Sequence, residues 1–344
     1  MPRRALTLLV AGIAVITAAV VAAVLPVPYV ILSPGPTLNT LGQAPGGQPL
    51  IDIEGHPVYP TVGHLNMVTV DVQGGPGIEI NIFTALRAWL DPHDAVVPQQ
   101  EVFGTGQSAQ QVLKQDVQEM TGSQELATAA ALTYLKIPFK TFIQVASTEP
   151  GMPAARVLRA GDVIAAVNGV PVDSLTALSA QIRAHPIGSP LKLTVVRNGK
   201  TIPLVVRSID SQGHAEIGVV VTTQYKFPFN VTIHVGNIGG PSAGMMFALG
   251  IIDKLRSVNL TGGRFIAGTG EITQKGAVQP IGGIQQKMVG ARAQGATVFL
   301  APAGNCADTR GAVPAGMRVV KVSTLAGAVS ALKALKAGRP VPSC

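Results

Sequence analysis

Two Gly-rich segments place a serine and a lysine where each could take part in hydrolytic chemistry. The first, Gly239-Gly240-Pro241-Ser242-Ala243-Gly244, puts Ser242 where an apolar helix begins. The second, Gly282-Gly283-Ile284-Gln285-Gln286-Lys287, puts Lys287 in the first turn of another helix. A lysine that gives up its proton readily is a natural base for a serine nucleophile. The pair therefore has the chemistry of a Ser–Lys hydrolase.

Lys287 stands beside an apolar stripe, formed by Ile284, Met288 and Ala291 at positions i, i+4 and i+7. Burial lowers the pKa of a lysine because the charged form loses its hydration. The positive end of a helix dipole also disfavours a cation in the first turn. Both effects favour the neutral amine that a general base needs. The alternative is an ordinary lysine whose amine extends to solvent.

Ser242 also has two interpretations. A serine at a helix start is often a capping residue, and a proline such as Pro241 suits the first helical turn. The same position points free backbone N–H groups at whatever the serine attacks, which would make an oxyanion site.

Other hydrolytic arrangements fit less well. Gly240-x-Ser242-x-Gly244 matches the nucleophile elbow of α/β-hydrolases, which needs a histidine after the serine. All six histidines precede Ser242, so chain order excludes that arrangement, although a triad with His234 as an upstream base stays open. Ser330-Ala331-Leu332-Lys333 fits the S-x-x-K motif of penicillin-binding proteins but lacks its partner motifs.

The elements that must position the pair form an α/β block over residues 228–335. Its expected elements are a strand at 229–235, a buried helix at 242–255, a helix at 284–294 that ends at Gly295, a strand at 297–300 and a helix at 324–337. Upstream, alternation predicts a strand at 64–73. Helices are expected at 80–89 and over 108–135, the latter interrupted at Thr121-Gly122-Ser123.

Residues 138–210 have a different, β-rich pattern, with Asn168-Gly169 predicted as a tight turn between strands. The loop Gly151-Met152-Pro153-Ala154-Ala155 and the core from Gly161-Asp162-Val163-Ile164 to Val167-Asn168-Gly169 closely resemble a bacterial PDZ domain. The resemblance implies binding of extended peptide ends by strand addition. The expected groove lies between the strand at 141–145 and the helix at 174–184, with the carboxylate loop near 135–138.

The surroundings of the pair resemble the proteolytic domain of Lon. The resemblance rests on Ile233-His234-Val235, the Ser242 segment, Gly268-Thr269-Gly270-Glu271-Ile272, Pro280-Ile281 before the Lys287 segment, and Ala296 to Pro302 with Asn305. It implies Ser242 as the nucleophile, Lys287 as the general base and Thr269 as a support for the lysine. Weaker matches at 63–70 and 107–110 imply that the PDZ domain is inserted into the protease domain. No Gly-x4-Gly-Lys-[Ser/Thr] phosphate loop is found, so we expect activity without ATP.

The sequence of the N-terminal segment predicts a membrane-spanning helix. Residues 5–25 carry no charge and follow Arg3 and Arg4. About 20 apolar residues span a bilayer, and basic flanks stay in the cytoplasm. We therefore expect a single-pass anchor in the cell membrane with the remaining chain extracytoplasmic; a cleaved signal peptide is the alternative.

The bulk composition adds two expectations. The net charge of +8 is mild, with no basic run interleaved with aromatics, which argues against nucleic-acid binding. Cys306 and Cys344 are the two cysteines, and outside the cytoplasm they could form a disulfide. The sequence indicates no cofactor and no metal site.

These features predict an α/β (α+β) Lon-type proteolytic domain with an inserted β-rich PDZ domain and a transmembrane helix. The expected parts are a tip and anchor at 1–31, a linker and first protease part at 32–137, the PDZ domain at 138–210 and the catalytic part at 211–344. The chain resembles the membrane-anchored, PDZ-containing Lon-like serine proteases of bacteria (YlbL-like). The resemblance implies an ATP-independent endopeptidase for unfolded or flexible envelope proteins, with the PDZ domain recruiting substrate or gating access, and a possible homo-oligomer. The alternative is a peptide-binding scaffold or regulator with an inactive protease domain.

Overall fold

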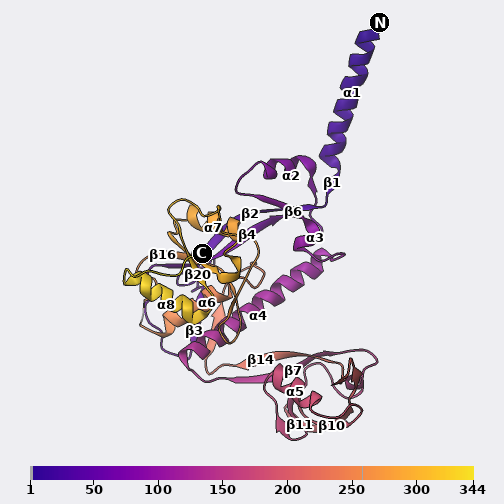
Figure 1. The fold of residues 1–344 in the computed structure, drawn as a ribbon, viewed down its shortest axis with the longest axis vertical. Coiled ribbons are helices and arrows are strands. Elements are labelled where there is room, and N and C mark those ends of the chain that lie inside the picture. The colour runs from indigo at the N-terminus through magenta and orange to yellow at the C-terminus, as the bar shows by residue number, and fades with distance from the viewer. Residues whose placement is uncertain (1–2, 258) are drawn as a thin grey trace. The chain divides into compact units, whose positions relative to one another are not determined.

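The computed structural model describes residues 3–257 and 259–344, which divide into two compact units (Figure 1). The first unit combines the chain up to Ile137 with Phe229–Cys344, and the second is Pro138–Pro228. The second unit is therefore inserted between two halves of the first. It reaches 18 residues beyond the expected end at 210, because strand β14 (Val219–Lys226) pairs along strand β7 (Lys140–Thr148).

The first unit is a mixed α/β structure. Its helices are α1 (Arg3–Val24), α2 (Ile82–Trp89), α3 (Gln99–Val102), α4 (Ala109–Leu135), α6 (Gly244–Leu255), α7 (Ile284–Ala293), η2 (Ala303–Asn305) and α8 (Leu325–Lys336). Its strands are β1 (Pro26–Val27), β2 (Tyr29–Asn39), β3 (Ile51–Glu54), β4 (His64–Gln73), β5 (Ile80–Asn81), β6 (Ala95–Pro98), β15 (Asn230–Ile233), β16 (Phe265–Gly268), β17 (Glu271–Ile272), β18 (Val278–Gln279), β19 (Val298–Pro302) and β20 (Arg318–Val322).

One six-stranded sheet organises this unit, in the order β20-β19-β16-β4-β2-β6. The strands from β20 to β4 are parallel, and β2 and β6 are antiparallel to their neighbours. Alternate side chains point to opposite faces. Ala267 and Phe299 pack against α7 on one face. On the other face, a Cβ at Gly268 would contact Met246 of α6 as well as Leu300 of β19. The sheet thus lies between α7, which carries Lys287, and α6, which follows Ser242.

Helix α4 runs without interruption from Ala109 to Leu135, so the expected break at residues 121–123 is wrong. A capping box starts it: Ser108 accepts from the Gln111 N–H, and the Gln111 side chain accepts from the Ser108 N–H. Its alanine-rich second half is buried and packs against α6. Burial of that face outweighs the low helix propensity of Gly122 and Ser123.

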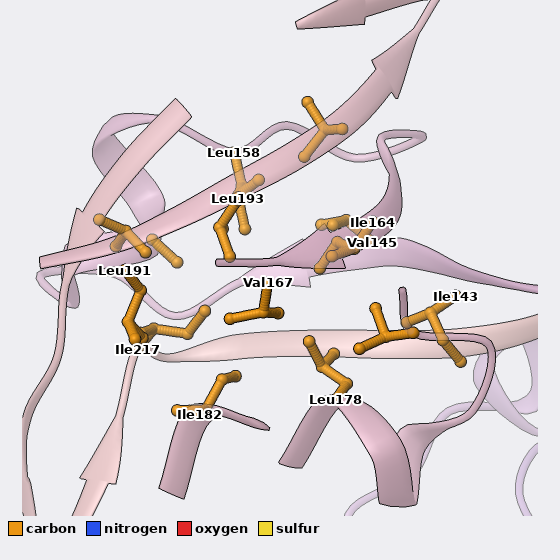
Figure 2. Close-up of a cluster of buried hydrophobic side chains, with 14 of the residues drawn as sticks. Ile143, Val145, Leu158, Ile164, Val167, Leu178, Ile182, Leu191, Leu193 and Ile217 are labelled. Atoms are coloured by element: carbon orange, nitrogen blue, oxygen red, sulfur yellow. The ribbon is translucent and has the colours of Figure 1, made fainter. Parts of the chain in front are cut away.

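The second unit contains a sheet in the order β11-β10-β8-β7-β14, with β9 paired to β8. The remaining bounds are η1 (Pro153–Arg156), β8 (Val163–Val167), β9 (Val170–Pro171), α5 (Leu175–Arg183), β10 (Pro190–Arg197), β11 (Lys200–Arg207), β12 (Ile209–Ser211) and β13 (His214–Glu216). Figure 2 shows its core, in which Leu178 and Ile182 of α5 face side chains of the sheet such as Ile143 and Val167.

Two features close this unit locally. Asn168 and Gly169 both have positive φ and join β8 to β9, as the Asn-Gly pair predicts. The buried carboxylate of Asp162 receives two hydrogen bonds of 2.7 Å from the Arg197 guanidinium. Arg197 thereby lowers the pKa of Asp162. A charged pair held in this bidentate geometry joins the loop before β8 to the end of β10.

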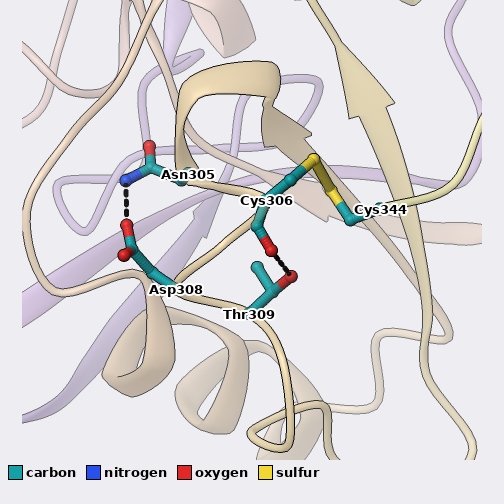
Figure 3. Close-up of a disulfide and its surroundings, with 5 residues drawn as sticks. All are labelled: Asn305, Cys306, Asp308, Thr309 and Cys344. Carbon is teal, nitrogen blue, oxygen red and sulfur yellow. Dashed lines mark hydrogen bonds between the residues drawn. A yellow bond between two sulfur atoms is a disulfide. The ribbon is translucent and has the colours of Figure 1, made fainter.

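A disulfide joins Cys306 to Cys344, with a Cα–Cα distance of 5.0 Å (Figure 3). Next to it, Lys321 of β20 donates its backbone N–H to Pro342, and Val320 bridges Ser343. Residues 342–344 are therefore held against the outer edge of the sheet.

Replacing both cysteines by serine is expected to lower the free energy of unfolding. The disulfide closes a loop with a sequence separation of 38 residues. The chain-entropy relation gives about 4 kcal/mol for such a loop, as an upper figure. Urea denaturation of Cys306→Ser/Cys344→Ser against the oxidised chain measures the loss. An unchanged midpoint and slope would contradict the expectation.

Helix α1 is the single candidate membrane span among the described residues. It has 22 residues, a mean hydropathy of 2.6 in its most apolar window and no buried side chain. This length and composition suit a bilayer crossing and also suit a signal sequence.

Candidate active site

The structure brings the candidate serine and lysine together. The Nζ atom of Lys287 lies 2.6 Å from Oγ of Ser242 and 3.3 Å from Oγ1 of Thr269. Thr269 in turn donates its hydroxyl hydrogen to the Ser242 carbonyl oxygen, at 3.0 Å. With that hydrogen committed, Thr269 Oγ1 can accept from the lysine amine. The lone pair of a neutral Lys287 is then free to accept the proton of the Ser242 hydroxyl.

Helix α7 carries Lys287 to this position. Gly283 caps the helix with a φ of 66°, and the Lys287 N–H bonds to its carbonyl in the first turn. The loop before the cap is held by Asn305, whose side chain accepts from the Ile281 N–H and donates to the Ile281 carbonyl. One helical turn later, a Cβ at Gly290 would lie 2.8 Å from the Gly35 carbonyl oxygen. Glycine therefore allows α7 to lie directly on β2.

Lys287 is only 4% exposed, and this burial lowers its pKa to about 8. The Glu271 carboxylate acts in the opposite direction and favours the ammonium form. Glu271 is itself half-buried, and its pKa is raised by burial and by Glu119, with Lys287 opposing. A lysine with a pKa near 8 supplies a substantial fraction of neutral amine in weakly alkaline solution.

Ser242 lies in the turn before α6 rather than at its start, because the helix begins at Gly244 with Ala243 as its N-cap. The capping interpretation therefore does not hold, since no side-chain cap is formed there. Among the described residues, no backbone acceptor receives the N–H of Ser242 or of Ala243. Free backbone N–H groups at and next to a nucleophile are the donors from which an oxyanion site can be built.

Helix α4 fixes the loop before Ser242. The Asp116 carbonyl accepts from the Gly240 N–H at 3.2 Å, and the buried Ser123 hydroxyl donates to the Pro241 carbonyl at 2.9 Å. The helix is so close that a Cβ at Gly239 would lie 2.5 Å from Cβ of Asp116. Sequence reasoning missed Asp116 and Ser123. No local signal marks them, because they act from a distant helix through single hydrogen bonds.

Ser242 and Lys287 open into a cavity of about 550 Å³. One wall is β4, from Met67 to Val72. The pairing of β4 with β16 stops at Met67, opposite Gly268. Beyond that point no described strand pairs with this edge of β4, whose residues line the cavity. An extended peptide could add to such an edge through main-chain hydrogen bonds.

Carboxylates line this cavity and its continuation. Asp71, Glu101 and Glu271 line the cavity itself. Lys287 is the one basic side chain among its lining residues. An adjoining cavity of about 660 Å³ adds Asp116 and Glu119. Burial and the nearby Glu119 raise the pKa of Asp116. The cleft is therefore acidic although the whole chain carries a net charge of +8.

The second unit has its own cavity, and the expected position of the peptide groove is wrong. Strand β7 is paired on both edges, by β8 and β14, so no peptide can add to it. The cavity, of about 330 Å³, lies between α5 and the segment Ser211–Val221, which includes the start of β14. The loop at residues 217–218, rather than 135–138, is therefore the one beside this cavity.

The alternative catalytic candidates, His234 and Ser330, do not line the cavity at Ser242 and Lys287. His234 lines a different cavity, with Gln48 and Gln124. Ser330 is exposed on α8. Within residues 3–257 and 259–344, no group of three His, Cys, Asp or Glu side chains is placed to hold a metal ion.

Two family profiles match the chain. The PDZ domain profile matches residues 118–207, and the profile of the Lon protease (S16) C-terminal proteolytic domain matches residues 214–332. The PDZ match starts within α4, which belongs to the first unit, and the Lon match starts within the second unit. The PDZ profile therefore starts 20 residues before the second unit and stops before β12, β13 and β14, and the Lon profile includes β13 and β14.

Individual relatives match shorter stretches of the chain. Lon protease 1 of Bacillus subtilis is 34% identical over 95 residues, which cover 27% of this chain and 12% of that protein. The periplasmic serine endoprotease DegP of Salmonella typhimurium is 42% identical over 59 residues, or 17% of this chain and 12% of that protein. Among solved structures, the PDZ domain of an SdrC-like protein of Listeria monocytogenes aligns at 26% identity and a TM-score of 0.22, covering 23% of this chain and 85% of that one. The chain thus corresponds to a small part of the length of these two proteases.

Proposed function

We propose that this chain, which combines a PDZ domain with a Lon-type proteolytic domain, is a serine endopeptidase that works with a Ser242–Lys287 dyad and without ATP. The observation that carries the proposal is the 2.6 Å contact between Ser242 Oγ and the Nζ atom of a buried lysine whose pKa is lowered to about 8. A serine within hydrogen-bond reach of a neutral base is the arrangement that activates a nucleophile.

In the proposed acylation step, the Ser242 hydroxyl gives its proton to Nζ of neutral Lys287 while Oγ attacks the peptide carbonyl carbon. The N–H groups of Ser242 and Ala243 receive the negative charge that develops on the carbonyl oxygen. The Lys287 ammonium then protonates the departing amine, and an ester on Ser242 remains. Water, deprotonated by Lys287, hydrolyses the ester and restores the serine. Thr269 holds the amine in line throughout.

We propose that the substrate lies extended along the free edge of β4, beyond Met67, with its scissile carbonyl at Ser242. Main-chain pairing of this kind needs a flexible or unfolded segment. The carboxylates along the cleft favour segments that carry lysine or arginine. The PDZ domain would supply a second peptide site at the edge of β14, recruiting substrate or gating access.

For location, we propose that α1 is retained as a single-pass anchor, with Arg3 and Arg4 on the cytoplasmic side and both units outside the cytoplasm. The proposed substrates are then unfolded or flexible proteins of the cell envelope.

Casein cleavage by the full-length chain in detergent, followed across pH, tests the proposal. Only the neutral amine acts as base, so kcat/KM is expected to rise through a pKa near 8 and to be about tenfold below its plateau at pH 7. A profile that is flat from pH 6 to 10 would contradict a lysine base. Peptide binding at the PDZ domain without any cleavage would favour a scaffold with an inactive protease domain.

A further inference from the structure

Helix α2 turns small side chains inward and large apolar side chains outward. Ala85 and Ala88 are buried in one cluster with Ile31 of β2 and Ile80 of β5. The exposed set is apolar and bulky: Ile82, Phe83, Leu86, Trp89 and Leu90. At 100° per residue these five positions fall within an arc of about 120°. An apolar stripe of this width normally faces a core, yet no part of the described chain covers it.

The exposed face is large for its length. Trp89 is 73% exposed and Leu90 is 79% exposed, and Ile78 just before β5 adds a further exposed apolar side chain. A contiguous apolar patch of this size indicates a surface that contacts a membrane or another protein.

The position of α2 in the chain indicates what covers it. Helix α1 ends at Val24, and two residues later β1 pairs with β5, with Pro26 opposite Asn81. Asn81 then caps α2, its side chain accepting from the Thr84 N–H. Helix α1 also contacts both β5 and α2. With 22 residues, α1 is about 33 Å long, close to the thickness of the hydrocarbon core. When α1 crosses a bilayer, α2 must lie where α1 leaves it.

The side chains of α2 suit that depth. Tryptophan concentrates at the membrane–water boundary, and α2 exposes Trp89 together with Phe83, which suits the apolar face of an interfacial helix. The chain after the helix, with Asp91 and Asp94, carries negative charge and belongs on the aqueous side. Arg87 is the only basic residue of α2, so apolar insertion rather than attraction to anionic lipid would hold it.

We propose that α2 is an interfacial helix that inserts Phe83, Leu86, Trp89 and Leu90 into the bilayer beside the end of α1. Two points of attachment then fix the tilt of the first unit against the membrane, whereas α1 alone would leave it free to swing. The inference does not depend on the chemistry assigned to Ser242.

Trp89 is the only tryptophan of the chain, so its fluorescence reports this position directly. The experiment uses the full-length chain, with α1 verified by intact mass, in phosphatidylcholine nanodiscs whose acyl chains are brominated. Bromine quenches only by close contact, so Trp89 emission is expected to fall roughly twofold or more relative to unbrominated discs, at low and at high salt alike. Aqueous iodide should quench it weakly.

The matched control moves the probe away from the membrane. Tyr59 is exposed in the loop before β4, and that loop ends at Gly63, beside Asn39 at the end of β2 distal from α1. In Trp89→Phe/Tyr59→Trp, iodide should quench the emission and brominated lipid should not. If brominated lipid leaves wild-type Trp89 unquenched, the proposal fails. Strong iodide quenching would then indicate a solvated helix, and protection from both quenchers would indicate a contact with another copy of the chain.

Discussion

Ser242→Ala is expected to lower kcat/KM for casein by about 10³-fold or more, with KM little changed. The hydroxyl is the nucleophile in the proposed mechanism, and removing a member of a catalytic dyad disables the group as a unit. The fold should be retained, because Ser242 lies in the turn before α6 and caps nothing. Initial rates of casein cleavage at pH 9, with the circular dichroism spectrum of each protein, measure the effect.

Ser330→Ala is the matched control, since Ser330 is an exposed serine in the one other motif that suggested a nucleophile. Its activity should equal that of the wild type. Equal casein degradation by wild type and Ser242→Ala would remove Ser242 from the mechanism, and loss of activity in Ser330→Ala alone would assign the nucleophile to α8.

Lys287→Met is expected to abolish activity by a similar factor and, unusually for a buried substitution, to raise stability at pH 7. Burial lowers the pKa of Lys287 from an ordinary value of 10.5 to about 8, so its ammonium form destabilises the folded state by about 3 kcal/mol at neutral pH. Methionine fills a similar volume without charge. Between pH 8 and 10.5 the unfolded chain holds the proton that the folded chain has lost, so wild-type stability rises with pH. The advantage of Lys287→Met should therefore shrink from pH 7 to pH 10.

Urea denaturation at pH 7 and pH 10 measures both parts of this expectation. Lys254→Met is the control: Lys254 is also partly buried, and its pKa is lowered by burial, but it lies at the end of α6 outside the cavity lined by Ser242 and Lys287. Its activity should be unchanged. A Lys287→Met protein that keeps activity would show that Lys287 is not the base. A Lys287→Met protein that is equally destabilised at both pH values would show that the Lys287 ammonium does not destabilise the folded state.

The local placement of Lys287 could be predicted because its signals are local. Gly283 before a helix and an apolar stripe beside Lys287 place that residue within one helical turn, and the structure adds that α7 packs on β2 through Gly290. Thr269 follows β16 directly, so its position was also set by a short stretch of chain. The distance between Ser242 and Lys287, in contrast, depends on how two separate helices lie on the sheet, which only the assembled unit determines.

The wrong expectations and the missed features share a physical cause, because each depends on a contact between segments that are distant in the sequence. Residues 121–123 look like a helix break when read alone, but burial against α6 keeps α4 continuous. Strand β7 looks like a groove wall until β14, more than 70 residues later, pairs with it. Asp116 and Ser123 hold the loop before Ser242 from a helix that precedes it by more than 100 positions. The outward face of α2 likewise becomes visible only when Ala85 and Ala88 are seen to be buried.

The segment held by Cys344 has a consequence for how copies of the chain behave together. Strand β20 is the outermost strand of the six-stranded sheet, and an uncovered outer strand offers its backbone groups to any neighbouring chain. Residues 342–344 lie against this outer edge of β20, through the Lys321–Pro342 hydrogen bond and the Val320–Ser343 bridge. The disulfide to Cys306 holds them in this position. Oxidation of the two cysteines is therefore expected to limit self-association, and reduction is expected to expose the backbone groups of β20 to strand pairing with another copy of the chain.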